Sequence, residues 1–120
     1  MLVHLLKSKI HRATVTASSL EYEGSLTIAE DLMEAVGLLP YERILCSNLA
    51  NGARWETYAI RGPRASGAIH LNGAVAHRGK VGDRLTIMAF TEIDAAQAAG
   101  WTPRVIVLGE GNRVVVERGI

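Results

Sequence analysis

A glycine followed by a serine, Gly24-Ser25, has the residue types for an unusual backbone reaction. In a strained turn, a serine hydroxyl can attack the carbonyl carbon of the preceding residue and convert the amide into an ester. Gly24 suits this reaction because it has no Cβ to obstruct the attack and tolerates strained backbone angles. β-Elimination and hydrolysis would then turn Ser25 into a pyruvoyl group, a ketone at a new N-terminus. The alternative is an ordinary turn before a strand, and the spacing alone does not decide between the two.

Two cations and a phenol could complete a reaction site. Lys9 and Arg54 can each hold a substrate carboxylate, and arginine can do so through two parallel hydrogen bonds. Tyr58 shares a predicted strand face with Arg54 and offers a phenol for proton transfer. The loop Asn72-Gly73-Ala74 supplies an amide and backbone N–H groups that could hold a carbonyl oxygen. Each also has an ordinary interpretation as a surface charge, a core aromatic residue or a turn.

Other common kinds of site find little support in the sequence. The histidines at positions 4, 11, 70 and 77 lie far apart, and no pair has the close spacing of a zinc site, so no metal is expected. Neither a Gly-x-Ser-x-Gly elbow nor a glycine-rich phosphate-binding pattern occurs. Cys46 lies in an apolar run, where a free cysteine is usually a small buried hydrophobic residue.

The composition describes one globular domain over residues 1–120. The chain is 48% apolar, and its 13 Lys and Arg against 12 Asp and Glu give a net charge of +1, which does not suggest a nucleic-acid partner. The apolar stretch before Lys7 is too short for a signal-peptide core or a membrane span. One cysteine fits a reducing compartment. We therefore expect a cytoplasmic protein with no membrane partner.

The chain reads mostly as short β-strands. The clearest helix is predicted over residues 30–37, where acidic residues in the first turn complement the dipole, Thr27 and Glu30 have capping-box spacing, and Gly37 provides a stop. A further helical turn or two is expected at residues 94–99. Strands are predicted at residues 1–7, 14–16, 44–46, 54–60, 68–71, 84–90, 104–108 and 113–117, with turns at Ser18-Ser19 and Asn51-Gly52. About eight short strands with two short helices predict a mainly β protein, a compact β-barrel.

Taken together, the motifs resemble those of the pyruvoyl-dependent aspartate decarboxylase family. The resemblance runs from the start of the chain to about residue 108, and it is specific because several ungapped motifs occur in the family's order. The matching segments are residues 9–16, 20–25, Asn51-Gly52 with Arg54, 57–60, 69–77 and Gly82-Asp83.

The resemblance implies a double-psi β-barrel, a homotetramer with active sites between subunits, and self-cleavage between Gly24 and Ser25. Cleavage would give a β chain of residues 1–24 and an α chain of residues 25–120. Ser25 would become the pyruvoyl cofactor, which forms a Schiff base with the substrate. Thr57 and Asn72 match family residues that assist this processing.

The implied reaction is decarboxylation of L-aspartate to β-alanine and CO₂, for pantothenate synthesis. Lys9 and Arg54 match the residues that bind the substrate carboxylate, and Tyr58 matches the proton donor. Thr57 and the pair Gly73-Ala74, the loop beside the pyruvoyl group, complete the implied substrate-binding set.

Some positions depart from the family pattern. Val75 stands where the family commonly has alanine, which predicts a slightly tighter pocket. Cys46-Ser47 and residues 61–64 differ as well, and the tail after Leu108 is not diagnostic. Two alternatives stay open: a non-catalytic barrel that keeps Gly24-Ser25 as a turn, and a decarboxylase of a substituted aspartate or of glutamate. The need for an accessory maturation factor is also open.

Overall fold

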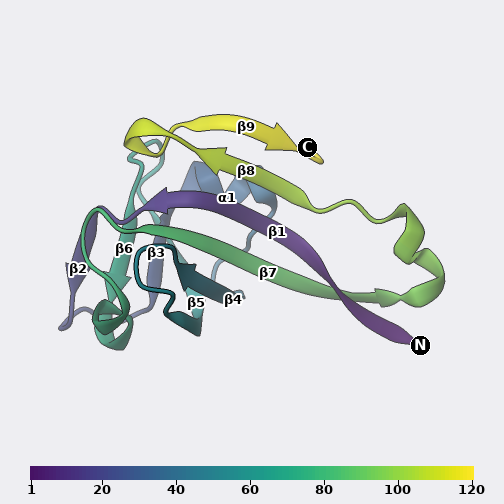
Figure 1. The fold of residues 1–120 in the computed structure, drawn as a ribbon, viewed down its shortest axis with the longest axis horizontal. Helices are drawn as coiled ribbons and strands as arrows, with labels where there is room; N and C mark the ends of the chain where they lie inside the picture. The colour runs from purple at the N-terminus through teal and green to yellow at the C-terminus, as the bar shows by residue number, and fades with distance from the viewer.

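The computed structural model describes residues 1–120 and consists mainly of nine β-strands arranged as one hydrogen-bonded series (Figure 1). The order across this series is β2-β6-β3-β5-β4-β7-β1-β8-β9. The predicted mainly β, barrel-like fold class is confirmed. The strands are β1 (Leu2–Thr14), β2 (Ala17–Ser19), β3 (Leu26–Ala29), β4 (Arg43–Asn48), β5 (Arg54–Gly62), β6 (Ile69–Asn72), β7 (Arg84–Asp94), β8 (Arg104–Leu108) and β9 (Val114–Arg118).

The long antiparallel pair of β1 and β7 extends well beyond the rest of the fold, with the N-terminus at its far end (Figure 1). The prediction of two separate strands at residues 1–7 and 14–16 was wrong, because β1 runs without a break from Leu2 to Thr14. The polar segment between them stays in the ladder since Ser8 and Ile10 turn inward and are fully buried while Lys9 turns outward. A register shift between His11 and Ala13 marks a β-bulge, at which Arg12 has a φ of 64°.

Aliphatic side chains from most of the strands fill the core, and one α-helix closes it. This helix, α1 (Glu30–Val36), buries Leu32, Met33 and Val36 and ends at Gly37, whose φ of 72° is the left-handed cap that the sequence predicted. The predicted capping box was wrong. The N-cap is Ala29 without a side-chain bond, because Thr27 belongs to β3 and its hydroxyl faces Asn72 instead.

Three short 3₁₀ helices complete the fold: η1 (Gly73–Arg78), η2 (Ala95–Gly100) and η3 (Glu110–Asn112). The helical turn expected at residues 94–99 is therefore confirmed as η2, and Asn51-Gly52 does form the turn between β4 and β5. The turn expected at Ser18-Ser19 is instead strand β2, paired with β6. Residues 73–74, expected in a loop, begin η1, whose short glycine- and alanine-rich sequence has no helical periodicity to reveal it. None of the helices has the length and hydropathy needed to cross a bilayer.

Candidate active site

The bond between Gly24 and Ser25 lies where the chain enters β3. Gly24 has a φ of +97°, and a Cβ atom at this position would lie 3.1 Å from Ile60 Cδ1 and 3.8 Å from Tyr58 Oη. Ser25 is only 6% exposed. The backbone angle favours glycine before the serine, and the Ile60 side chain would have to shift slightly to admit a Cβ atom. The bond is therefore held in a conformation that other residues would resist.

An amide side chain fixes the residue on the other side of this bond. Asn72 Nδ2 donates to the Ser25 carbonyl oxygen at 2.8 Å and to Thr27 Oγ1 at 2.7 Å. The antiparallel pairing of β3 with β6, in which Thr27 lies opposite His70, brings Asn72 to this place. Because Asn72 and Thr27 are both buried, these bonds are shielded from water and hold the Ser25 carbonyl firmly.

The start of η1 passes close to the same bond. Gly73 has a φ of 63°, and a Cβ atom there would lie 3.4 Å from the Tyr22 carbonyl oxygen and 3.9 Å from the Gly24 carbonyl oxygen. Glycine therefore lets the backbone of η1 lie against the loop that carries the bond. Gly73 thus lies beside Gly24, whereas Ala74 is exposed at the start of η1 and its role beside the bond stays a prediction.

Strand β5 brings the phenol of Tyr58 to the bond. It runs parallel to β3 with Ala59 beside Leu26, and the preceding residue, Tyr58, has its Oη 3.8 Å from where a Cβ atom at Gly24 would lie. Tyr58 is 40% exposed, which shows that it is not a core tyrosine. Thr57 comes directly before Tyr58 on β5, and neither its hydroxyl nor the Gly24 carbonyl makes a hydrogen bond.

The two predicted carboxylate binders are not brought to Ser25 within one chain. Arg54 lies on the Tyr58 face of β5, but four residues away, which is roughly 13 Å along a strand. Lys9 lies on β1, three strands from β5 and roughly 14 Å away at the usual strand spacing. From Lys9 on β1, the cross-strand row runs through Met88 on β7 and Leu45 on β4 to Glu56 on β5. Neither cation forms an ion pair, so both are free to bind an anion.

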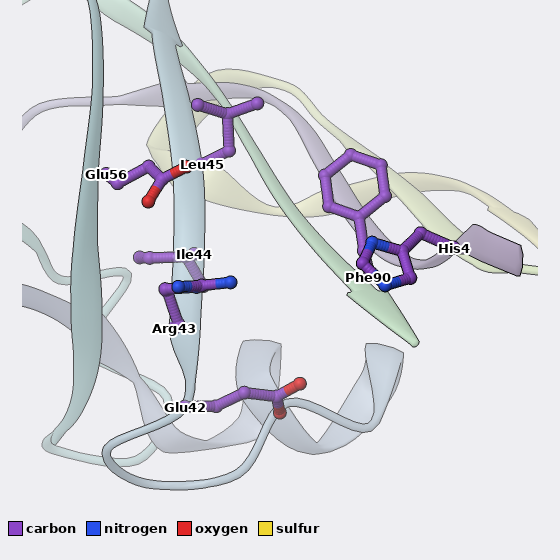
Figure 2. A pocket seen from close by; sticks show the side chains of 7 residues that line it. All are labelled: His4, Glu42, Arg43, Ile44, Leu45, Glu56 and Phe90. Carbon is purple, nitrogen blue, oxygen red and sulfur yellow. The ribbon is translucent and has the colours of Figure 1, made fainter. Parts of the chain in front are cut away.

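A hollow of about 410 Å³ lies on the face of the sheet that carries Lys9, Leu45 and Glu56. It is lined by His4, Glu42, Arg43, Ile44, Leu45, Glu56 and Phe90. Figure 2 shows Phe90 and His4 together on one side of it, across from the side chains of β4. It contains none of the predicted site residues, although Arg43 lies directly opposite Tyr58 in the ladder. A second hollow, of about 340 Å³, borders Tyr22, Thr27 and Asn72 and so lies next to the Ser25 neighbourhood.

His11, two residues after Lys9 on β1, is not a second cation near neutral pH. Burial lowers the pKa of His11, and the positive charges of Lys9, Arg12 and Arg118 lower it further. Its Nδ1 lies 3.2 Å from Thr86 Oγ1 in a hydrogen bond. His11 therefore adds little positive charge to the Lys9–Arg12 motif at pH 7.

The remaining reactive groups offer no competing site. Burial raises the pKa of the Cys46 thiol to about 12, so it is not a thiolate at neutral pH. No three His, Cys, Asp or Glu side chains come together in a way that could hold a metal ion. The fold and the site thus define a small β-barrel protein in which Tyr58, Asn72 and Gly73 surround one Gly-Ser bond.

The comparisons with known proteins identify the family. A family model described as aspartate decarboxylase matches residues 1–115. The chain is 53% identical over 112 residues to the aspartate 1-decarboxylases of Burkholderia vietnamiensis and Burkholderia cenocepacia (strain J2315), covering 92% of this chain and 88% of each relative. It is 50% identical over 115 residues to the aspartate 1-decarboxylase of Thioalkalivibrio sulfidiphilus, covering 96% of this chain and 91% of that relative. This chain belongs to the aspartate decarboxylase family.

Three residues at the bond were not predicted from the sequence: Tyr22, Thr27 and Ile60. For Thr27 a signal exists, because it follows Ser25 by two positions in a strand and so shares its face. Tyr22 and Ile60 reach the bond only through the path of the loop and the β3–β5 register, which no local pattern reveals.

Proposed function

We propose that this chain cleaves itself between Gly24 and Ser25 and then decarboxylates L-aspartate to β-alanine and CO₂, the role of its family in pantothenate synthesis. Family membership supports the reaction. The main structural support for this site is the conformation of Gly24, which has a positive φ and has Tyr58 Oη beside it.

Self-cleavage proceeds by three balanced steps. Ser25 Oγ bonds to the Gly24 carbonyl carbon as the C–N bond breaks, which leaves an ester and a free Ser25 amine. The ester then loses the Ser25 Hα as a proton and Gly24 as a carboxylate, and water replaces the nitrogen and releases ammonia. Thr57, which directly precedes Tyr58 on β5, donates to the oxyanion that develops at the Gly24 carbonyl. Asn72 holds the Ser25 carbonyl during the reaction.

The residues around Ser25 fit a pyruvoyl group, because the site is nearly buried and Asn72 already binds its carbonyl oxygen. The group supplies an electron sink for the pair released as CO₂ leaves. Arg54 and Lys9 bind the carboxylate that the substrate keeps, and Gly73-Ala74 borders the substrate from η1. Tyr58 Oη donates the proton that replaces CO₂ at the substrate Cα.

The position of Lys9 supports an assembly in which subunits share their active sites. Lys9, Arg54 and Tyr58 lie on one open face of the sheet, yet Lys9 is three strands away from β5. Packing this face against a second copy would bring cations of one subunit, Lys9 among them, to Ser25 of the other. We therefore propose a homotetramer with active sites between neighbouring subunits.

Denaturing mass spectrometry of the purified protein, before and after incubation, tests the proposed function. We expect fragments of residues 1–24 and 25–120, the larger with a ketone in place of its amine, and CO₂ release from aspartate. A chain that stays intact and inactive, even with cell extract added, would contradict it, whereas cleavage only with extract would indicate a maturation factor. Rates on aspartate, methyl-aspartate and glutamate separate the substrate alternatives that Val75 leaves open.

Mixing two inactive variants tests the shared site. Lys9→Ala and Tyr58→Phe proteins are each expected to have little activity, whereas coexpression should restore about a quarter of the wild-type rate per site. This fraction follows because random pairing gives one site in about four an intact Lys9 from one subunit and an intact Tyr58 from the other. Activity no greater than the mean of the two variants would show that each site is built by one chain.

A further inference from the structure

The far end of η1 is held by two amide side chains, one at the end of β4 and the other in the turn that leads to β5. Asn48 Nδ2 donates to the Arg78 carbonyl oxygen at 3.0 Å, and Asn51 Nδ2 donates to the same oxygen at 3.1 Å. Asn48 is 1% exposed, so its bond is shielded from water. The last residue of η1 is thus tied to the hairpin whose second strand carries Arg54 and Tyr58.

A buried carboxylate completes this arrangement. Asp83 Oδ2 accepts from Asn48 Nδ2 at 2.9 Å and from the Lys80 backbone N–H at 3.0 Å, and Asp83 is 7% exposed. The hydrogen bond from Asn48, followed by that from the Lys80 backbone, lowers the pKa of Asp83. Asp83 is therefore ionised at neutral pH, where it orients the Asn48 amide. We call Asn48, Asn51 and Asp83, with the Arg78 carbonyl, the amide clamp.

The clamp leaves no room for a side chain at the residue after η1. A Cβ atom at Gly79 would lie 2.7 Å from Asn48 Nδ2 and 3.2 Å from Asp83 Oδ2. The chain can pass over the Asn48–Asp83 pair only because this residue is glycine. Its φ of −174° is ordinary extended backbone, so the requirement arises from space alone.

The opposite end of η1 lies at the reactive bond. Asn72, the residue before η1, binds the Ser25 carbonyl, and Gly73, its first residue, lies against the Gly24 and Tyr22 carbonyls. Between these ends η1 has no buried residue and no side-chain N-cap, although Val75 and Ala76 pack partly against the core. A six-residue 3₁₀ helix spans only about 12 Å, so a shift at Arg78 is passed on to Gly73.

We propose that the amide clamp positions Asn72 and Gly73 against the Gly24–Ser25 bond and thereby sets the rate of self-cleavage and of the turnover that follows. The inference rests on the proposed function, and it assigns Asn48 and Asp83 as positioning residues that touch neither the bond nor the substrate. A displacement of about 1 Å at a reacting group can cost a factor of roughly 100 in rate. The clamp is the contact that prevents such a displacement of η1.

Four variants test the clamp. Asn48→Ala and Asp83→Ala remove it, whereas Asp83→Asn can keep it, because both short bonds fall on one carboxylate oxygen that an amide oxygen can replace. The matched control is Asn112→Gly. Asn112 is also buried, accepts one backbone N–H from Thr14, and donates to the Thr14 and Gly67 carbonyls, but it makes no hydrogen bond with η1. Glycine suits its φ of 59°.

The measurements are the first-order rate of cleavage by mass spectrometry, kcat and KM on aspartate, and Tm, with rates taken well below the lowest Tm. We expect cleavage and kcat to fall roughly 10- to 100-fold in Asn48→Ala and Asp83→Ala. Asp83→Asn loses the negative charge and the 3.4 Å contact with the exposed Lys80 ammonium but keeps both short hydrogen bonds, so its rates should stay within about fivefold of wild type. Asn112→Gly should lower Tm while leaving both rates near wild type.

Two results would overturn the clamp. The first is that Asn48→Ala and Asp83→Ala cleave and turn over at wild-type rates. The second is that Asn112→Gly loses as much rate as the clamp variants do, which would show that the effect comes from lower stability alone. Wild-type protein is assayed in parallel, and its failure to cleave and turn over would count against the proposed function. A failure confined to the comparison among variants counts against the clamp only.

Discussion

Replacing Ser25 with alanine is expected to give one intact chain of 120 residues that releases no CO₂ from aspartate. Alanine has no hydroxyl to attack the Gly24 carbonyl, so no ester forms and no ketone follows. Without the ketone the electron pair left by CO₂ has no acceptor, and the loss should be complete rather than a weakening. Denaturing mass spectrometry and a β-alanine assay on the same preparation measure both effects.

The control for this variant is Ser66→Ala, the same substitution at an exposed turn remote from Gly24. It should cleave and turn over like wild type. The Ser25→Ala chain should also keep its fold, because Asn72 binds the backbone carbonyl of residue 25 and not its hydroxyl. Decarboxylation of aspartate by a Ser25→Ala protein that is verified to be uncleaved would rule out the pyruvoyl mechanism.

The parts of the site that the sequence predicted well depend on local chemistry. Gly24 before Ser25 can be recognised because no other residue type combines its backbone freedom with an absent Cβ, and the structure uses both properties. The Asn51-Gly52 turn was likewise predictable from its residue types, and strands β8 and β9 were predictable because turn residues stand between two β-branched runs. Gly37 as a helix stop follows the same reasoning.

The parts that escaped prediction depend on which strands become neighbours. Thr27 and Glu30 have the spacing of a capping box, but the pairing of β3 with β6 gives the Thr27 hydroxyl to Asn72. A charged run such as Lys7 to Arg12 resembles a break between strands, although alternation keeps it in the ladder of β1 and β7. The clamp joins Asn48 to Asp83 across 35 residues, and no periodicity in the sequence links them.

Replacing Tyr58 with phenylalanine is the second large effect that we expect. Cleavage between Gly24 and Ser25 should proceed, because the reaction uses the Ser25 hydroxyl and the phenylalanine ring still fills the space beside Gly24. Turnover should fall, because Tyr58 Oη is the group that supplies the proton to the substrate Cα. Loss of a positioned general acid typically costs a factor of about 10² to 10⁴, and we expect kcat to fall within that range.

The matched control is Tyr41→Phe. Tyr41 is the exposed neighbour of Tyr58, with ring centroids 6.5 Å apart, so the same hydroxyl is removed from the same surface. Its kcat should stay near wild type. KM separates the proton-donor role from a binding role, because Arg54 and Lys9 bind the retained carboxylate in both variants and KM should change little. A Tyr58→Phe enzyme with raised KM and unchanged kcat would make Tyr58 a binding residue, and the proton would have to come from another group at the Gly24–Ser25 site.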